Sequence, residues 1–341
     1  MKCGSSGYRE DISSIDIMKF FMSICVVAIH TRPFVEIDNE IISRFYEVIV
    51  RIAVPFFFIS SGYLLFGKLK YPYCNTQSLK KVKSSIIRTL KIYCIWTFVY
   101  MPITIYDYCT NGKSIVDNIK HFSQGLFFLG EHLNSWPLWY LLSAFYGLGI
   151  IYVLLKRKMN PKHVFVCSFV LYILGDVLDL LVSYKDIMPK WIDIVLQIYI
   201  DTFLKGRITQ GVFFISCGMM LCTMKIRLTK MYYYLFVLGC VIYSFFEMNI
   251  MKSLGLALYS NLFFIILLNG GGERTFRYGE YFRIASKVIY FTHMIFYTIY
   301  VMIAYRKTES YGMDVFLATL FLSIGTSIIY IIYKKQFFKV L

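Results

Sequence analysis

Apolar stretches about twenty residues long alternate with short charged segments along almost the whole chain. A helix needs about 20 mostly apolar residues to cross the ~30 Å hydrocarbon layer of a bilayer. Such windows occur at 15–34, 46–66, 88–106, 137–155, 163–183, 208–224, 231–247, 253–269, 284–304 and 313–333. The pattern predicts an all-α integral membrane protein, a bundle of about ten transmembrane helices. The sixth and seventh windows are the least distinct, because only KIRLTK separates them.

The distribution of lysine and arginine predicts the topology. With the N-terminus in the cytoplasm, the inside segments hold 22 of these residues and the outside segments hold 12. Cytoplasmic loops of membrane proteins carry such an excess of positive charge. We therefore expect both termini to be cytoplasmic.

Composition supports a membrane protein and excludes other classes. The 341 residues are 58% hydrophobic and 16% charged, whereas soluble domains are about half apolar and a quarter charged. A net charge of +16 can indicate nucleic-acid binding, but here the charges lie in short segments between apolar runs. We expect a lipid bilayer and no nucleic acid as partner. The nine cysteines show no metal-ligand spacing, so neither a disulfide framework nor a metal site is predicted.

No internal repeat or low-complexity tract is visible, and the last apolar window lies close to the end of the sequence. We therefore expect one transmembrane domain over residues 1–341, with no appended soluble domain.

The first apolar window carries unusual polar side chains. Lys19 and His30 are eleven residues apart, which places them within about 20° of one helix face and ~16 Å apart along the axis. Asp16 lies one turn before Lys19 and can pair with it. Charged groups inside a membrane are costly and usually functional, and a neutral imidazole suits the role of general base toward a hydroxyl. The alternative is a snorkelling lysine and a hydrogen-bonded core histidine.

A basic pair, Arg88 and Lys91, opens the third window within RTLKIYCIW. The two cations share a helix face at the cytoplasmic surface, where they can hold phosphates or an anionic headgroup. Lys80, Lys81 and Lys83 widen this basic surface. The alternative is the ordinary positive charge found at the inner end of a membrane helix.

Three further motifs lie in the second, fourth and ninth windows. In VPFFFISSGYLL, the small residues around Gly62 predict close helix packing. Trp139 and Tyr140 belong either to an interfacial aromatic belt or to a stacking platform for an acyl chain or sugar. In the ninth window a polar stripe faces the bundle, formed by Ser286, Tyr290 and His293.

Two outside segments are long, at 107–136 and 184–207. Both mix acidic and aromatic residues, a composition that suits sugar binding. Amphipathic helices lying on the lipid headgroups are the alternative interpretation.

Taken in order, these motifs resemble the bacterial acyltransferase-3 family of multi-pass membrane acyltransferases. The resemblance runs from residue 11 to about residue 300. The matching elements are Asp16-x-x-Lys19-x10-His30, VPFFFISSGYLL, Arg88-x-x-Lys91-Ile-Tyr, Pro137-Leu-Trp139-Tyr140-Leu and Ser286-x-x-x-Tyr290-x-x-His293.

The resemblance implies transfer of an acyl group, commonly acetyl, from cytoplasmic acyl-CoA to a hydroxyl of a cell-surface or exported glycan. It implies a bacterial inner-membrane location, His30 as the catalytic histidine and Lys19 in the basic position of its motif. Arg88 and Lys91 match the family's Arg-x-x-Arg pair for the coenzyme's phosphates, with lysine replacing the second arginine. We expect Asp16 to fix Lys19, acyl-CoA to act as a donor substrate and no bound cofactor.

A competing class is a non-enzymatic exporter or flippase of a lipid-linked glycan, since intramembrane histidine and lysine also serve proton relays. Transporters usually show internal repeats or a corresponding pair of helices broken by Gly or Pro, and we see neither an internal repeat nor such a helix pair in this sequence. On this basis we expect acyltransferase chemistry.

Overall fold

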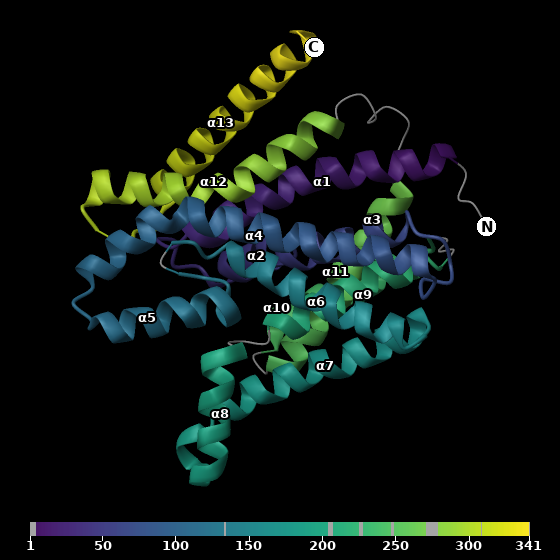
Figure 1. Cartoon of the computed structure of the whole chain (residues 1–341), viewed down its shortest axis with the longest axis horizontal. Coiled ribbons are helices and arrows are strands. Elements are labelled where there is room, and N and C mark those ends of the chain that lie inside the picture. Colours follow the sequence, from purple (N-terminus) through teal and green to yellow (C-terminus); the bar gives the residue numbers. More distant parts are fainter. Residues whose placement is uncertain are drawn as a thin grey trace. The chain divides into compact units, whose positions relative to one another are not determined.

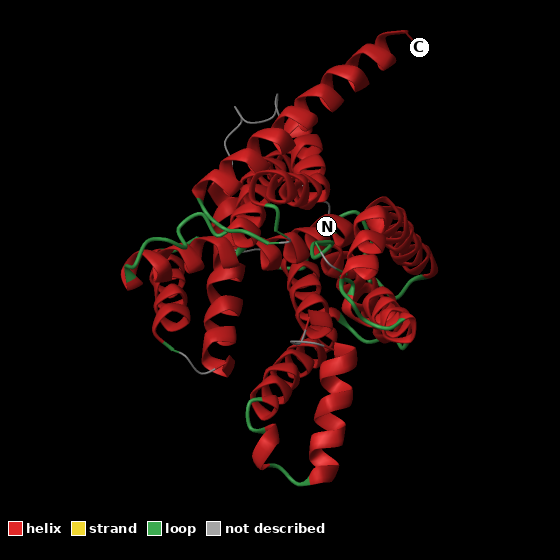
Figure 2. Cartoon of the chain, turned by 90° about the vertical axis from the view of Figure 1, so that its left-hand side faces the viewer, coloured by secondary structure: helices red, strands yellow, loops and turns green. Residues whose placement is uncertain are grey.

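The computed structural model describes residues 5–132, 134–203, 207–224, 228–246, 249–270, 279–307 and 309–340. Within these ranges the chain forms helices joined by short connections, without a β-strand (Figures 1 and 2). The all-helical fold is therefore confirmed.

Eight helical segments of the described chain are long and apolar enough to cross a membrane. They are Ser13–Thr31, Glu40–Phe66, Thr76–Thr110, Leu138–Lys156, Pro161–Val182, Ile250–Asn269, Gly279–Tyr305 and Met313–Lys334. The sixth and seventh predicted windows also form helices, α9 (Arg207–Leu221) and α10 (Lys230–Phe245), but both are shorter. The multi-pass membrane class is confirmed, whereas the count of ten spans and the side on which the termini lie stay predictions.

The two long segments predicted to lie outside, 107–136 and 184–207, are largely helical where the structure describes them. The first contains α5 (Ile115–Gln124) and a π-helical turn, η1 (Gly125–Leu129), and the second contains a 3₁₀ turn, η2 (Lys185–Ile187), and α8 (Lys190–Phe203). Ser114 caps α5, its hydroxyl accepting a hydrogen bond from the backbone N–H of Asp117. Helices in both segments agree with the amphipathic interpretation of these regions.

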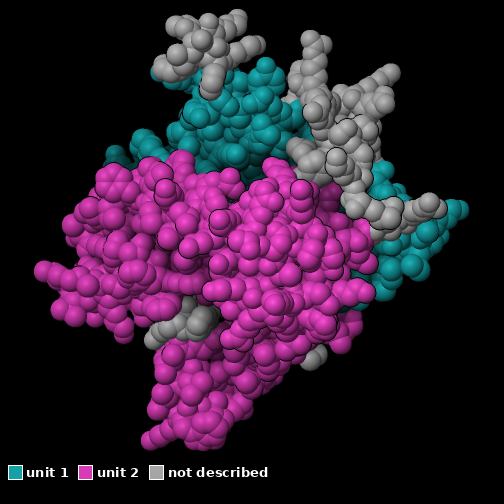
Figure 3. Space-filling model, turned by 45° about the vertical axis from the view of Figure 1, so that its right-hand side comes forward, with its two compact units in different colours: residues 1–57, 226–245, 258–341 teal, residues 58–225, 246–257 magenta. Residues whose placement is uncertain are grey.

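The chain divides into two compact units, coloured separately in Figure 3. Unit 1 comprises Met1–Phe57, Ile226–Phe245 and Leu258–Leu341, and unit 2 comprises Phe58–Lys225 and Phe246–Ala257. The boundaries fall within α3 (Ala53–Phe66) and α11 (Asn249–Gly270), so each of these helices contributes to both units.

In unit 1, α1 (Ser5–Thr31) packs along α12 (Gly279–Tyr305), which packs against α13 (Met313–Val340) (Figure 1). α2 (Glu40–Arg51) contacts both α1 and α10. The side chains of Val27, Ile289 and Met294 are buried where these helices pack. Gly279 allows close approach, because a Cβ there would meet the Ser13 hydroxyl at 2.9 Å.

In unit 2, α6 (Leu138–Lys156) packs against α4 (Thr76–Thr110) and α9, and α7 (Pro161–Val182) packs against α9. Small residues let these backbones approach closely. A Cβ at Gly62 would lie 2.2 Å from the carbonyl oxygen of Ile215, and one at Gly218 would lie 2.1 Å from that of Ile59. The close helix packing predicted for the small residues around Gly62 is thereby confirmed.

Candidate functional site

A polar stripe in unit 1 begins with a buried carboxylate on α1. The Asp16 side chain is 4% exposed, and its Oδ2 lies 3.6 Å from Nη1 of Arg283 on α12. The sequence reasoning missed Arg283, although it lies three residues before Ser286 on the same helical repeat as Tyr290 and His293. Extending the 286–290–293 pattern back by one turn would have found it. The expected pairing of Asp16 with Lys19 stays a prediction.

Lys19 and His30 both lie on α1, which is continuous from Ser5 to Thr31. Both side chains are half-buried, and the helix keeps the spacing of ~16 Å expected for eleven residues. Ser23, between them, donates its hydroxyl to the carbonyl of Phe20 at 2.7 Å, a bond within its own helix.

The two intramembrane histidines come together where α1 packs on α12. The imidazole centroids of His30 and His293 are 5.5 Å apart and the ring planes are inclined by 33°. His293 is fully buried, and its Nδ1 lies 3.1 Å from the carbonyl oxygen of Ile289. Its Nε2 is buried without a hydrogen-bond partner among the described residues. The sequence indicated two functional intramembrane histidines, and the packing of α1 on α12 makes them neighbours.

The remaining polar residues of the ninth window lie on the same helix. Ser286 is buried and donates its hydroxyl to the carbonyl of Arg283 at 3.1 Å. The Tyr290 ring lies 5.6 Å from the Phe57 ring and 6.2 Å from the His293 imidazole, centroid to centroid. α12 thus presents Tyr290 and His293 together.

Several contacts fix the last turn of α1, which carries His30. The Tyr46 hydroxyl donates to the carbonyl of Ala28 at 2.6 Å, and the backbone N–H of Gly312 donates to the carbonyl of Thr31 at 3.0 Å. Beyond the helix end, the Arg32 guanidinium lies over the Tyr311 ring, 4.7 Å from its centroid. The bond from Gly312 satisfies a carbonyl that the helix end leaves open, and the bond from Tyr46 is a second one to Ala28, whose carbonyl also accepts from the backbone N–H of Arg32. The backbone around His30 is therefore held firmly.

Unit 2 carries the basic pair on a helix longer than predicted. The window 88–106 lies inside α4, which begins at Thr76 because the Asn75 side chain caps it by accepting from the backbone N–H of Ser78 at 2.8 Å. The apolar window misses the first turns, since polar Ser78 and Ser85 are buried there beside Val82. An apolarity criterion cannot recognise such a polar extension.

The extra turns of α4 add three lysines to the basic pair, so that five cations lie on one side of the helix. At about 100° per residue they fall within roughly 160° of its circumference. All five side chains are exposed: Lys80, Lys81, Lys83, Arg88 and Lys91. The closest polar contact of this set is from Arg88 Nη2 to the Ser85 hydroxyl, at 3.5 Å. We call this set the basic face of α4.

Trp139 and Tyr140, also in unit 2, are held by their neighbours. The Tyr140 hydroxyl lies 3.0 Å from the Ser61 hydroxyl, and its ring lies 4.5 Å from the Phe58 ring. The Arg207 guanidinium lies over the Trp139 ring at 5.0 Å and pairs with Glu131 at 2.5 Å. Cation–π contact of this kind fixes the indole and covers part of its ring.

Two intramembrane carboxylates of unit 2 were missed. Asp176 on α7 is buried and accepts a hydrogen bond from the Ser253 hydroxyl at 2.9 Å, and Asp179 accepts one from the Tyr199 hydroxyl at 2.8 Å. The signal was present as GDVLDL inside the fifth apolar window, because carboxylates are rare in membrane helices.

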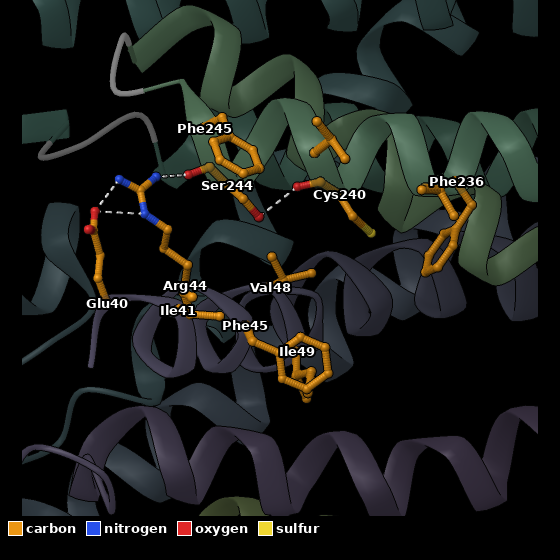
Figure 4. A pocket seen from close by; sticks show the side chains of 12 residues that line it. Glu40, Ile41, Arg44, Phe45, Val48, Ile49, Phe236, Cys240, Ser244 and Phe245 are labelled. Atoms are coloured by element: carbon orange, nitrogen blue, oxygen red, sulfur yellow. Dashed lines mark hydrogen bonds and ion pairs between the residues drawn. The ribbon is translucent and has the colours of Figure 1, made fainter. Parts of the chain in front are cut away.

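A groove of about 680 Å³ lies between α2 and α10 in unit 1 (Figure 4). Its lining is apolar except at one end, where Arg44 forms an ion pair with Glu40 and donates to the carbonyl of Ser244. None of the residues predicted for the functional site lines this groove. The histidine pair therefore lies outside it.

Comparison with known proteins identifies the class. The model of the acyltransferase-3 family, described as "Acyltransferase domain", matches residues 12–334. The chain belongs to this family, and the predicted resemblance is confirmed. Membership supports an acyltransferase in a multi-pass membrane fold.

Curated relatives carry racemase names. An amino-acid racemase of Enterococcus faecalis is 33% identical over 171 residues, covering 49% of this chain and 22% of the relative. Another amino-acid racemase from the same organism is 28% identical over 251 residues, which cover 70% of this chain and 34% of the relative. A serine/alanine racemase of Enterococcus gallinarum is 29% identical over 165 residues, covering 47% and 22%. The chain thus spans about a third or less of these relatives. No solved structure matches it.

Proposed function

We propose that this protein transfers an acyl group, most commonly acetyl, from cytoplasmic acyl-CoA to a hydroxyl of a cell-surface or exported glycan, at the bacterial inner membrane. The observation that carries the proposal is the placement of His30 beside the buried His293, 5.5 Å between ring centroids, within a chain of the acyltransferase-3 family.

His30 acts as general base in the proposed reaction. It takes the proton of the acceptor hydroxyl as the oxygen attacks the thioester carbonyl carbon, and a C–O bond forms while the C–S bond breaks. The proton then passes from His30 to the departing coenzyme A thiolate. Base catalysis of this kind contributes roughly 10²–10⁴-fold. Transfer is direct, and isolation of a labelled acyl-protein in the absence of acceptor would favour an acyl-enzyme instead.

Lys19 and Asp16 complete the proposed catalytic set. Lys19 orients the donor or balances developing negative charge, and Asp16 fixes Lys19. The ion pair between Asp16 and Arg283 supports a charge-pairing role for Asp16.

The basic face of α4 binds the coenzyme in this proposal. Coenzyme A is strongly anionic, and exposed cations on one helix side suit its phosphates. Arg88 can bind a phosphate with two parallel hydrogen bonds, whereas Lys91 contributes a point charge. The absence of acidic residues on α4 before Asp107 supports this assignment.

For the acceptor, we propose contacts from two sets of residues. Ser286, Tyr290 and His293 form one set, and Trp139 and Tyr140 form a stacking platform for an acyl chain or sugar. Aromatic rings paired with hydroxyl and imidazole groups suit a polyhydroxylated sugar, whose faces are apolar and whose edges form hydrogen bonds. The acceptor is then a glycan or a lipid-linked saccharide.

Racemase activity is not part of the proposal, because the match covers only 22–34% of the relatives that bear that name. The alternative is export or flipping of a lipid-linked glycan. If the purified protein hydrolyses acyl-CoA or transfers its acyl group, a flippase without enzymatic activity is excluded.

The test is transfer from radiolabelled acetyl-CoA in membranes, comparing the natural protein with His30→Ala at matched expression. Label should reach a glycan fraction with the natural protein and fall by about 10²-fold or more with the variant. Equal labelling would remove His30 from the mechanism. Absence of label in both, repeated with succinyl-CoA, would favour the exporter.

A further inference from the structure

We propose that His293 is a positioning residue for His30: it holds the His30 imidazole in one tautomer and orientation, so that the opposite ring nitrogen receives the acceptor's proton. The inference rests on the proposed function, and it replaces the proposed contact of His293 with the glycan, because both ring nitrogens of His293 are then engaged by Ile289 and His30.

The surroundings of His293 determine its own tautomer. Its Nδ1 lies 3.1 Å from the carbonyl oxygen of Ile289, and a carbonyl only accepts hydrogen bonds, so Nδ1 carries the proton. In a neutral imidazole the other nitrogen is then an acceptor. That Nε2 is buried and has no hydrogen-bond partner among the described residues. A buried nitrogen that lacks a hydrogen-bond donor is costly. We therefore expect a neighbouring N–H or O–H group to donate a hydrogen bond to Nε2.

His30 is placed to be that donor. Ring centroids 5.5 Å apart with an inclination of 33° allow a nitrogen of each ring to approach to roughly 3 Å, the range of an N–H···N bond. The bonds that Ala28 and Thr31 accept hold the turn that carries His30. A small rotation of the His30 side chain, which is half-buried, suffices to form the contact.

The chemical consequence is an oriented base. When one His30 nitrogen donates to Nε2 of His293, the other carries the lone pair and faces away from α12. On proton transfer from the acceptor hydroxyl, His30 becomes an imidazolium whose second N–H still donates to His293. The proton then leaves with the coenzyme A thiolate, and the pair returns to its starting state. A base oriented by a third group is a recurrent arrangement in nucleophilic catalysis.

Two variants of His293 and one control test the role. His293→Leu removes the nitrogen that accepts the hydrogen bond from His30, and His293→Gln keeps a hydrogen-bonding side chain. Thr298→Val is the control, because Thr298 is buried on the same helix and its hydroxyl bonds to the carbonyl of Met294. With His293→Leu we expect kcat to fall about 10–100-fold, the loss typical of removing such a supporting partner, with KM for acetyl-CoA unchanged. His293→Gln should recover part of the loss, and Thr298→Val should match the natural protein.

The loss must also depend on His30. In a His30→Ala background, His293→Leu should cause no further loss, because the residue that it positions is gone. A loss of the same factor in both backgrounds would indicate a merely structural role and overturn the proposal. If His293→Leu does not accumulate in membranes, His293→Gln carries the same comparison.

A second readout does not require transfer activity. Diethyl pyrocarbonate acylates the bare nitrogen of a neutral imidazole, and mass spectrometry follows modification of the peptide that contains His30. We expect this modification to be several-fold slower with His293→Leu than with Thr298→Val. If the natural protein shows no transferase activity but His30 is modified more slowly in His293→Leu than in Thr298→Val, the proposed function is refuted and the positioning role is kept. Equal modification rates together with equal kcat would refute the positioning role.

Discussion

The polar stripe of unit 1, which runs from Asp16 and Arg283 to His30 and His293, differs in exposure from the basic face of α4. The stripe is mostly buried, and the basic face is exposed. Along the stripe, Asp16 and His293 are buried and each is tied to a neighbour on α12. On α4, all five cations are exposed, and the Arg88 guanidinium lies 3.5 Å from the Ser85 hydroxyl. Burial makes a polar group costly unless it is paired, whereas exposure leaves a charge available to a soluble anion.

This difference indicates how the proposed chemistry is divided. Groups that must keep one geometry during proton transfer belong in a packed, water-poor interface, where hydrogen bonds hold them. Groups that capture a soluble, highly charged donor belong on a wet surface, where the donor can reach them. Changes in the stripe should therefore lower kcat or stability, and changes on the basic face of α4 should raise KM.

The largest effect is expected from Arg283→Leu. The variant removes a cation from the buried Asp16 carboxylate, 4% exposed, and breaking a buried ion pair costs roughly 3–5 kcal/mol. We expect a strongly lowered melting temperature in detergent and reduced accumulation. Because Arg283 itself is 42% exposed, the loss should lie at or below the lower end of that range.

The double variant Asp16→Asn/Arg283→Leu separates charge from packing. It should recover much of the stability, since no carboxylate is then left buried beside a missing guanidinium. Arg51→Leu is the matched control, because its pair with Glu47 is surface-exposed and worth only about 0–1 kcal/mol. Equal losses for the two arginines would contradict the division between buried stripe and exposed surface.

The next effect concerns the donor. Arg88→Ala/Lys91→Ala should raise KM for acetyl-CoA about 10–100-fold, since each hydrogen bond to a charged group contributes roughly 1.5–3 kcal/mol, and solvent screening reduces this at an exposed site. The maximal rate should change little, and the natural protein's KM should rise with salt. Lys120→Ala, on α5, is the control. A fall in kcat with unchanged KM would assign Arg88 and Lys91 to the reaction centre instead.

The sequence predicted the parts of this protein that depend on local pattern. The all-helical class, the multi-pass pattern of apolar helices and the placement of Lys19 and His30 on one helix follow from periodicity and apolar length. The apposition of His30 and His293 could not be predicted, because it depends on α1 packing along α12 across more than 250 residues. The start of α4 was missed because buried Ser78 and Ser85 give no apolar signal. Arg283 and Asp176 were present as patterns but were passed over.

A smaller, pH-dependent effect is expected in unit 2. His132 is 9% exposed, its ring stacks on Phe122 at 4.9 Å, and burial lowers its pKa from 6.5 to about 4. Between these values the unfolded chain binds a proton that the folded chain does not, so stability falls as pH drops from 6.5 to 4 and is constant above pH 7. The loss is of order 2 kcal/mol at the acid end. The difference in melting temperature between the natural protein and His132→Gln, followed from pH 7.5 to 4.5, should therefore shrink. A constant difference would show that folding does not lower the pKa of His132.

The smallest effect sharpens the view of α4 as a phosphate-binding surface. Lys91→Arg introduces the arginine that the family resemblance implies at this position. It replaces a point charge by a planar guanidinium that can bind phosphate with two hydrogen bonds. We expect KM for acetyl-CoA to fall about two- to fivefold, less than the tenfold that 1.4 kcal/mol would give, because the exposed side chain remains solvated. The converse change, Arg88→Lys, should raise KM by a similar factor while the charge stays constant. If both variants have the same KM for acetyl-CoA as the natural protein, the basic face attracts the donor through its net charge alone. Its five cations then contribute a general positive potential and do not act as specific phosphate ligands.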